Sequence, residues 1–384
     1  MRFPAFSGEW IESKLGDIAD FSKGAGISKD QRSEEGNPCI LYGELYTRYK
    51  SEVITNVFSK TALPDSELVK SKSNDIIIPA SGETAEDIAT ARCVPFDNIL
   101  LGGDLNIIRL HEQDGKFFSY QLNGVRKYDI ATVAQGVSVV HLHAGDLKGI
   151  TVKYPSHIAE QEKISQILGL IDDRIATQSK IIEELTTLRS ALLEKVFQVS
   201  NPTLEVGAIA HQTSERNKLC RYSNVLSVSN RFGFINQSEQ FEDRNVASDD
   251  VRNYKVVHRG DFAYNPARIN VGSIAMLKSF EFGIVSPMYI CFQVDDTIVD
   301  PSFFELFLET KAFKDEMEIR LEGSVRRCLS FEALCEIHLP RPALLVQRSI
   351  SDKIGNISSK IKLEDRILRA YIRQKEWLLK QMFI

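Results

Sequence analysis

The chain has 384 residues, of which 43% are hydrophobic and 26% are charged, and its 47 Lys and Arg residues against 52 Asp and Glu residues give a formal net charge of −5. This composition excludes a disordered or collagen-like chain and predicts two or three folded domains. No stretch approaches the roughly 18 apolar residues of a membrane span, and the first ten residues carry charge and proline where a signal peptide needs an apolar run. We therefore expect a cytoplasmic protein that has no membrane partner.

The first 156 residues combine short β-rich runs with one helix-like segment. The runs at 75–79, 105–110 and 150–154 are separated by turn residues, and a helical pattern covers 117–126. This alternation predicts a mixed α+β domain.

A single long helix is predicted for residues 157–199. Residues 157–198 contain no proline, while Pro155 and Pro202 mark the two ends. Apolar residues recur there in alternating steps of four and three, which is the a/d seam of a coiled coil, although a helix packed on a globular core is the alternative. The apolar seam positions are Ile164, Leu168, Ile171, Ile175, Ile182, Leu185 and Leu192, and polar residues occupy the seam at Gln178 and Arg189.

The rest of the chain repeats this organisation at an offset near 186 residues. Asp75 corresponds to Asp261 and Gln161 to Gln347. The second copy has strand-like runs at 262–265 and 288–294 and a helical pattern at 303–320. A period of this length indicates an internal duplication, in which a second α+β domain occupies residues 200–341.

The seam repeats as well, in a second long helix predicted for residues 342–384. Its polar positions, Glu364 and Lys375, correspond to Gln178 and Arg189, and polar seam residues of this kind fix the register of a coiled coil. The apolar positions are Ile350, Ile354, Ile357, Ile361, Leu368 and Leu378.

The two long helices are expected to run antiparallel. The first would extend for ~63 Å at ~1.5 Å per residue, whereas a domain the size of residues 200–341 is only about 35–40 Å across. That domain could not return the chain to the start of the first helix. The predicted fold class is therefore α+β, with two similar domains joined by an antiparallel coiled coil and related by an internal pseudo-two-fold repeat.

The order of the motifs resembles that of the specificity subunits of type I restriction–modification systems. Trp10 and Leu15-Gly16-Asp17-Ile18 open the chain, a variable domain follows, and Pro155 with Glu160-Gln161 leads into a long helix before the same order begins again. The second copy departs from the pattern because Val346-Gln347 stands where Glu-Gln is usual. The resemblance extends over nearly the entire chain.

This resemblance implies a DNA-recognition role without a catalytic site. Residues 1–156 and 200–341 would be target-recognition domains, each reading one half of an asymmetric, interrupted double-stranded DNA target, and residues 157–199 and 342–384 would be the spacer helices. The implied partners are two methyltransferase subunits, which carry S-adenosylmethionine, and restriction/translocase subunits. No cofactor is expected on this chain itself.

Candidate DNA contacts are Arg, Lys, Asn, Ser and Tyr residues in segments rich in glycine or aromatic residues. Arginine can bind guanine through two parallel hydrogen bonds and asparagine can do the same to adenine, while lysine and serine suit phosphate. The candidates are Tyr42, Tyr46, Arg48, Tyr49, Ser81, Arg92, Lys218, Arg268, Asn270, Ser324, Arg326 and Arg327.

Charge argues against tight DNA binding by the isolated chain. Residues 1–156 and 200–341 each carry a net charge of −4. The second domain is nevertheless polarised, because residues 216–268 hold nine basic against six acidic residues while residues 281–322 hold three against ten. Partner subunits would have to supply much of the attraction to phosphate.

Catalytic and metal-binding motifs are missing from the sequence. Asn265-Pro266-Ala267-Arg268 has only half of the Asn/Asp-Pro-Pro-aromatic motif of adenine methyltransferases, and there is no Walker loop. His141 with His143, and Cys335 with His338, lack further ligands for a metal, and the six cysteines show no paired spacing. The alternative to DNA recognition is a coiled-coil scaffold or adaptor with two protein-binding domains.

Overall fold

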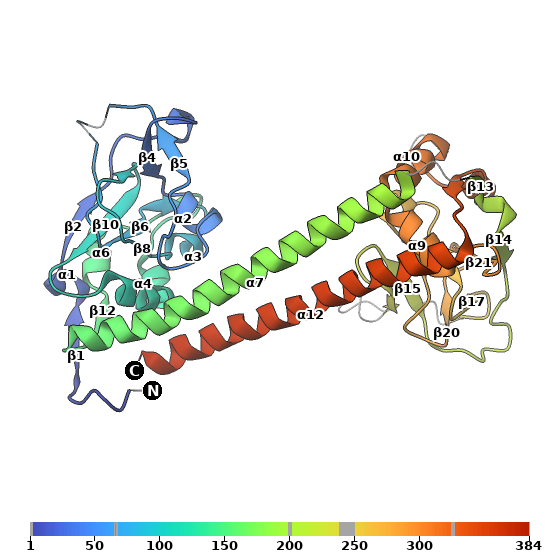
Figure 1. Ribbon diagram of the computed structural model, residues 1–384. Helices are drawn as coiled ribbons and strands as arrows, with labels where there is room; N and C mark the ends of the chain where they lie inside the picture. The colour runs from blue at the N-terminus through green and yellow to red at the C-terminus, as the bar shows by residue number, and fades with distance from the viewer. Residues whose placement is uncertain are drawn as a thin grey trace. The chain divides into compact units, whose positions relative to one another are not determined.

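The computed structural model of the chain describes residues 3–64, 66, 68–198, 202–237, 250–323 and 327–383. It divides into two compact units (Figure 1). Unit 1 comprises residues 1–181 with 364–384, and unit 2 comprises residues 182–363. Each unit therefore holds one globular domain, part of the first long helix and part of the second.

The domain of unit 1 precedes the first long helix. Its elements are β1 (Trp10–Lys14), α1 (Leu15–Ile18), β2 (Ala19–Lys23), η1 (Lys29–Gln31), β3 (Arg32–Ser33), β4 (Asn37–Ile40), α2 (Glu44–Thr47), β5 (Ser59–Thr61), β6 (Asp75–Pro79), β7 (Ser81–Gly82), α3 (Ala85–Ile88), β8 (Arg92–Val94), β9 (Leu100–Leu101), β10 (Leu105–Leu110), α4 (Gly115–Asn123), α5 (Lys127–Val133), β11 (Val140–His141), α6 (Ala144–Lys148) and β12 (Thr151–Pro155). The central sheet is antiparallel in the order β2-β10-β6-β8, β1 pairs with β12 and β7 with β11, and a second sheet has the order β3-β5-β4-β9.

The domain of unit 2 lies between the two long helices in the chain. Its elements are β13 (Thr203–Glu205), η3 (Val206–Ala208), β14 (Ala210–Thr213), β15 (Leu226–Ser229), β16 (Gly233–Asn236), β17 (Lys255–His258), β18 (Phe262–Tyr264), η4 (Ile269–Val271), β19 (Ile274–Met276), β20 (Phe282–Val285), β21 (Ile290–Val294), α9 (Pro301–Glu309), α10 (Lys311–Arg320), α11 (Phe331–Cys335) and β22 (His338–Pro340). Its central sheet has the order β14-β21-β18-β19, and β13 pairs with β22.

The central sheets of the two domains have the same strand order, as a duplicated chain requires. Strands β2, β10, β6 and β8 take the positions that β14, β21, β18 and β19 take in the second copy. An aspartate begins or precedes the third strand of each sheet: Asp75 accepts hydrogen bonds from Arg109 at 2.8 and 2.7 Å, and Asp261 accepts one from Gln293 at 2.8 Å. The scaffold is thus shared, while the partner of the aspartate differs.

The segments inserted between the first and third of these strands differ between the domains. In unit 1 the segment from β2 to β6 contains α2 and the strands β3, β4 and β5, which form a sheet with β9. In unit 2 the described part of the segment from β14 to β18 contains the β15–β16 hairpin and β17, which pairs with β20. The two domains therefore present different surfaces on one scaffold.

The first long helix, α7, spans Ile158–Gln198, and the second, α12, spans Leu344–Met382. These bounds lie within two residues of the predicted helices. Every predicted seam position in both helices is buried or half-buried. In unit 1 the helices run antiparallel, because Asp172, Arg174 and Gln178 contact Lys375, Tyr371 and Glu364 in that order. In unit 2, Arg189 donates a hydrogen bond to Ser358 at 2.7 Å.

The core of each domain extends onto both helices. In unit 1, Ile164 and Leu168 of α7 and Met382 of α12 pack in one cluster with Phe117 and Phe118. The equivalent cluster in unit 2 contains Leu193 and Phe197 of α7, Ile354 of α12, and the corresponding Phe303 and Phe304. Burial of these apolar side chains holds each domain on its pair of helix ends.

A hydrogen-bond network repeats at the junction between domain and helix. Gln161 accepts a hydrogen bond from the Asp114 amide at 3.0 Å and donates one to the Pro155 carbonyl at 2.9 Å, and Ser165 donates to the Asp114 carboxylate at 2.6 Å.

The same bonds recur in unit 2 between residues offset by 186, apart from the proline, whose offset is 187. Gln347 accepts from the Asp300 amide at 2.9 Å and donates to the Pro342 carbonyl at 2.8 Å, and Ser351 donates to the Asp300 carboxylate at 2.9 Å. Asp114 and Asp300 also cap the first turns of α4 and α9. The replacement of glutamate by Val346 therefore leaves this junction intact.

One predicted element is wrong in its extent. The helical pattern at 303–320 is two helices, α9 and α10, because Thr310 has extended backbone angles and its hydroxyl accepts a hydrogen bond from the Phe313 amide at 3.2 Å. A threonine that caps a new helix interrupts the first without a proline or glycine. Within the described residues no helix is long and apolar enough to cross a membrane.

Candidate nucleic-acid interface

The DNA-contact residues predicted in the first domain gather around α2. Tyr42 and Tyr46 are half-buried, and Arg48 is exposed. Burial raises the pKa of Tyr46, and neighbouring Tyr42 contributes to the increase. Ser81 is buried in β7, where its strand pairs with β11. Of this group, Arg48 is the residue with a charge available at the surface.

Arg48 belongs to a cluster around a buried carboxylate. Glu44 accepts hydrogen bonds from Ser59 and from the Leu41 amide, and it lies 3.5 Å from Arg48 and 3.9 Å from Arg32. The Arg48 guanidinium also lies over the Phe58 ring, 4.5 Å from its centroid. Phe58 is 48% exposed, so an arginine and an aromatic ring are presented together.

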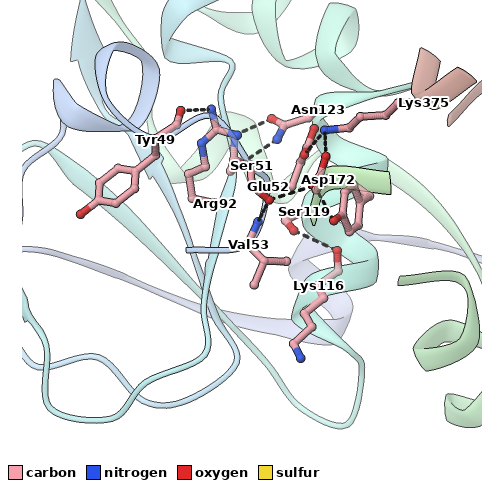
Figure 2. Close-up of polar contacts among 12 residues, drawn as sticks. Tyr49, Ser51, Glu52, Val53, Arg92, Lys116, Ser119, Asn123, Asp172 and Lys375 are labelled. Atoms are coloured by element: carbon pink, nitrogen blue, oxygen red, sulfur yellow. Dashed lines mark hydrogen bonds and ion pairs between the residues drawn. The ribbon is translucent and has the colours of Figure 1, made fainter. Parts of the chain in front are cut away.

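Arg92 is not a surface residue, and its predicted role as a DNA contact is wrong in this structure. Its side chain is 7% exposed. Its guanidinium donates to the Leu45 carbonyl at 3.0 Å and to the Tyr49 carbonyl at 2.9 Å, and the second bond is drawn in Figure 2. Burial lowers the pKa of Arg92. Arg92, which lies in β8, therefore binds carbonyls of α2 and of the residues after it. Its guanidinium is buried and is not accessible to DNA.

Tyr49 is buried as well, so it also falls outside the accessible surface. Its ring packs 5.3 Å from Phe58, and burial raises its pKa to about 12. Arg92 and Tyr49 therefore have a structural role: Arg92 binds the Tyr49 carbonyl, and the Tyr49 ring packs against the exposed Phe58.

A buried ionic cluster joins the first domain to both helices (Figure 2). Lys375 of α12 pairs with Glu52 of the domain and, at 2.6 Å, with Asp172 of α7. Asp172 also accepts hydrogen bonds from Ser51 at 2.8 Å and from Tyr120 at 2.7 Å. The cluster fixes three segments of unit 1 with charges that are largely removed from water.

Burial governs the protonation of this cluster. It raises the pKa of Glu52, and burial followed by the charge of Asp172 raises the pKa of Tyr120. Burial alone would lower the pKa of Lys375, but attraction to Glu52 and Asp172 raises it. Lys375 therefore remains a cation beside the two acidic side chains.

The equivalent seam residue, Arg189, makes a similar junction in unit 2. Its guanidinium binds the Glu309 carboxylate at 2.8 and 3.0 Å and donates to Ser358, which corresponds to Asp172. The sequence placed Arg189 and Lys375 at matching positions, and in both units they connect a domain to the helices.

The predicted contacts in the second domain are mostly exposed. Lys218, Arg268 and Asn270 are exposed, the last two around the turn η4. Arg327 is exposed too, but it pairs with Glu318 on α10 and donates to the Glu318 carbonyl at 2.9 Å. Ser324 and Arg326 lie outside the described residues.

Sequence reasoning missed Arg231 and Phe232, at the tip of the β15–β16 hairpin. The Arg231 guanidinium lies 5.1 Å from the centroid of the Phe232 ring, and Phe232 is 67% exposed. The sequence signal that could have found them is an arginine beside a large apolar residue, followed by Gly233, between two short β-rich runs.

Among the residues that the structure describes, no group of three or more His, Cys, Asp or Glu side chains could hold a metal ion. All six cysteines are free thiols, and burial raises the pKa of Cys39 to about 11 and of Cys93 and Cys291 to about 12. Thiols of this kind are unreactive at neutral pH.

Comparison with known families identifies the first part of the chain. Residues 7–187 match the family described as the type I restriction modification DNA specificity domain. This stretch of the chain is a type I specificity domain. It includes the first domain and most of α7.

Comparisons that cover the whole chain agree with this family. The specificity subunit of type I restriction enzyme MjaVIII from Methanocaldococcus jannaschii is 22% identical, over 93% of this chain and 88% of that protein. The crystal structure of the S subunit of a type I restriction–modification system from M. genitalium shares the fold, with a TM-score of 0.65 at 18% identity, over 98% of this chain and 96% of that chain.

A structure from a study of complex assembly and conformational transition of the type I system also shares the fold. Its TM-score is 0.55 at 13% identity, over 98% of both chains. The specificity domain and the curated relative support a type I specificity subunit, as the order of the motifs predicted. Specificity subunits are the non-catalytic members of their complexes, in agreement with the prediction that the chain is not an enzyme.

Proposed function

We propose that this specificity subunit reads an asymmetric, interrupted sequence in double-stranded DNA, one half with each domain. Helices α7 and α12 form an antiparallel coiled coil that sets the length of the unread gap. Two methyltransferase subunits carrying S-adenosylmethionine dock on the chain, and restriction/translocase subunits complete the complex in the cytoplasm. The specificity subunit itself binds no cofactor.

One observation carries this proposal: the two domains share a scaffold and differ in what is inserted into it. The strand order and the Asp114–Gln161–Ser165 network recur in unit 2, whereas the segments between the first and third sheet strands do not. A repeated scaffold offers two similar docking positions to two identical partners. Different inserts suit the reading of two different half-sites.

Pairing of the helices supports the spacer role. Gln178 donates hydrogen bonds to the backbone carbonyl of Glu364, at 3.2 Å, and to its carboxylate. These residues occupy equivalent positions in the two repeats. In a two-fold arrangement, equivalent residues meet at the symmetry axis, so a contact of this kind is expected there. A polar pair buried in an apolar seam also fixes the register of the helices.

The net charge of the chain favours a DNA-binding role for the partner subunits. The formal net charge of −5 gives the isolated chain little attraction to phosphate. The methyltransferase subunits therefore supply much of the contact with the DNA backbone, while this chain supplies selectivity.

Co-expression with a methyltransferase subunit of a type I system tests the proposal. Sequencing of modified bases is expected to show methylation of one asymmetric, interrupted sequence, and this methylation should disappear when the specificity subunit is omitted. The control is the methyltransferase subunit expressed alone under the same conditions. A purified complex that assembles but leaves DNA unmodified and unbound would favour a coiled-coil scaffold with two protein-binding domains.

A further inference from the structure

The inserted segments are the places where the two domains differ, so the side chains that distinguish two half-sites should lie on or beside them. This inference rests on the proposed function. In unit 2 the insert includes the β15–β16 hairpin, whose strands pair from Leu226↔Asn236 to Ser229↔Gly233. Residues 230–232 form the connecting loop, and Gly233 follows with a positive φ of 66°, which suits glycine.

The loop of this hairpin presents an arginine and a phenylalanine to solvent. The Ser229 hydroxyl accepts hydrogen bonds from the amides of Arg231 and Phe232 at 3.3 and 3.4 Å, which holds the loop closed. Phe232 is 67% exposed, and the guanidinium of Arg231 lies over its ring. An exposed aromatic residue in so tight a loop gains no core burial, so its apolar face is available to a ligand.

A second turn lies beside this loop. A Cβ atom on Gly272 would lie 3.3 Å from the Cβ of Asn230, and the hydroxyl of Ser273 donates to the Val228 carbonyl at 3.0 Å. The turn η4 therefore packs against the hairpin, and it exposes Arg268, Asn270 and the 58% exposed Val271. Two neighbouring turns thus form one surface, which we name the hairpin ridge: Arg231, Phe232, Arg268, Asn270 and Val271.

Charge favours nucleic acid as the ligand of the hairpin ridge. Residues 226–237 and 262–277 contain two charged side chains, Arg231 and Arg268, in a chain where 26% of residues are charged and acids outnumber bases. Among the described residues neither guanidinium pairs with a carboxylate. By contrast, Arg252, Arg259 and Arg327 of the same unit all have carboxylate partners. Two arginines that have no carboxylate partner in the described part of the chain suit phosphate and base edges.

The first domain carries a comparable pair in the corresponding insert. Arg48 lies over Phe58 between β2 and β6, as Arg231 lies over Phe232 between β14 and β18. The two pairs occur on unrelated local structures, since α2 and β5 have no counterpart in the hairpin. What the two pairs share is their chemistry: in each domain an arginine and an exposed phenylalanine lie at the surface of the inserted segment, which differs between the domains.

We infer that the hairpin ridge is the DNA-contacting surface of the second domain. Arg231 and Arg268 bind phosphate or guanine, Asn270 binds a base edge, and Phe232 with Val271 contacts the apolar parts of bases and sugars in a groove. Arg48 with Phe58 takes the same role in the first domain. The ligand is duplex DNA, and a protein partner on this surface is the outcome that the experiment must separate from it.

The test compares two double variants of the chain assembled with its methyltransferase subunits. Arg231→Gln/Phe232→Ser removes the pair, and Lys314→Gln/Ile319→Ser makes a matched change on α10, where both side chains are exposed. The first variant is expected to bind target DNA at least ~10-fold more weakly. The slope of the logarithm of the binding constant against the logarithm of the salt concentration should also become less steep by about one for each phosphate contact that is lost. The same variant should also lower the selectivity for particular bases in one half-site of the methylated sequence, and leave the other half-site unchanged. The control should match the unaltered complex.

Several outcomes would overturn the inference. Unchanged affinity and an unchanged methylated sequence would exclude the hairpin ridge as a DNA contact, while the proposed function would stand because the unaltered complex still methylates its target. Loss of methyltransferase binding, with DNA binding retained, would assign the surface to a protein. If the double variant does not fold, Arg268→Gln on the neighbouring turn tests the same surface, with the same loss of affinity expected. Absence of sequence-selective methylation by the unaltered complex would instead refute the proposed function.

Discussion

Replacing Lys375 with methionine is expected to lower the free energy of unfolding of unit 1 by about 3–5 kcal/mol, because removing one partner of a buried ion pair leaves the other charge without compensation. Here two carboxylates are left, on Glu52 and Asp172, and both are buried. They would also repel each other. The two tryptophans of the chain, Trp10 and Trp377, both belong to unit 1, so tryptophan fluorescence during urea denaturation measures this unit directly.

Two further variants make this measurement specific. Lys380→Met removes an exposed lysine from the same helix and should change the free energy of unfolding by less than about 0.5 kcal/mol. Combining Lys375→Met with Glu52→Gln and Asp172→Asn should recover part of the loss, since the uncompensated charges are then absent. Equal effects of Lys375→Met and Lys380→Met would show that the cluster does not hold α12 on the domain.

Lengthening both helices by one heptad is expected to lengthen the gap between the half-sites without changing the bases read. A second copy of residues 179–185 would follow Gln178, and a second copy of 357–363 would precede Glu364. The insertions then face each other, because Gln178 contacts Glu364. Seven residues add ~10.5 Å at ~1.5 Å per residue, which is about three base pairs at ~3.4 Å each.

Helical twist makes the expected result more specific. One heptad returns a helix to within about 20° of its starting face, but three base pairs rotate the duplex by roughly 100° at about 10.5 base pairs per turn. We therefore expect a longer gap together with less efficient methylation. Sequencing of modified bases measures both, and insertion into α7 alone, which breaks the pairing, is the control that should abolish methylation. Altered half-sites with an unaltered gap would contradict the spacer role.

Features set by local periodicity could be predicted from the sequence. Both long helices agree with their predicted bounds within two residues, and the matching of Gln161 with Gln347 corresponds to the same hydrogen bonds in each unit. Such features depend on spacing along the chain, which the sequence displays directly. The prediction of one helix at 303–320 was wrong because the capping hydroxyl of Thr310 is a local signal that the apolar pattern conceals.

Features set by distant partners could not be predicted. Arg92 had the residue type of a DNA contact, but carbonyls of Leu45 and Tyr49, more than 40 positions away, take up its guanidinium. Lys375 was recognised as a polar seam residue, while its pairing with Glu52, 323 positions away, was not. A sequence shows that a charge is present, but burial and counter-ions decide whether it faces DNA or holds the fold together.

The central claim, that each domain reads its own half-site, is tested most directly by replacing residues 202–340 with the second domain of another type I specificity subunit. After co-expression with the methyltransferase subunits, sequencing of modified bases should show one half of the methylated sequence changed, and the other half and the gap preserved. A change in both halves, or in neither, would contradict the assignment of one domain to each half-site.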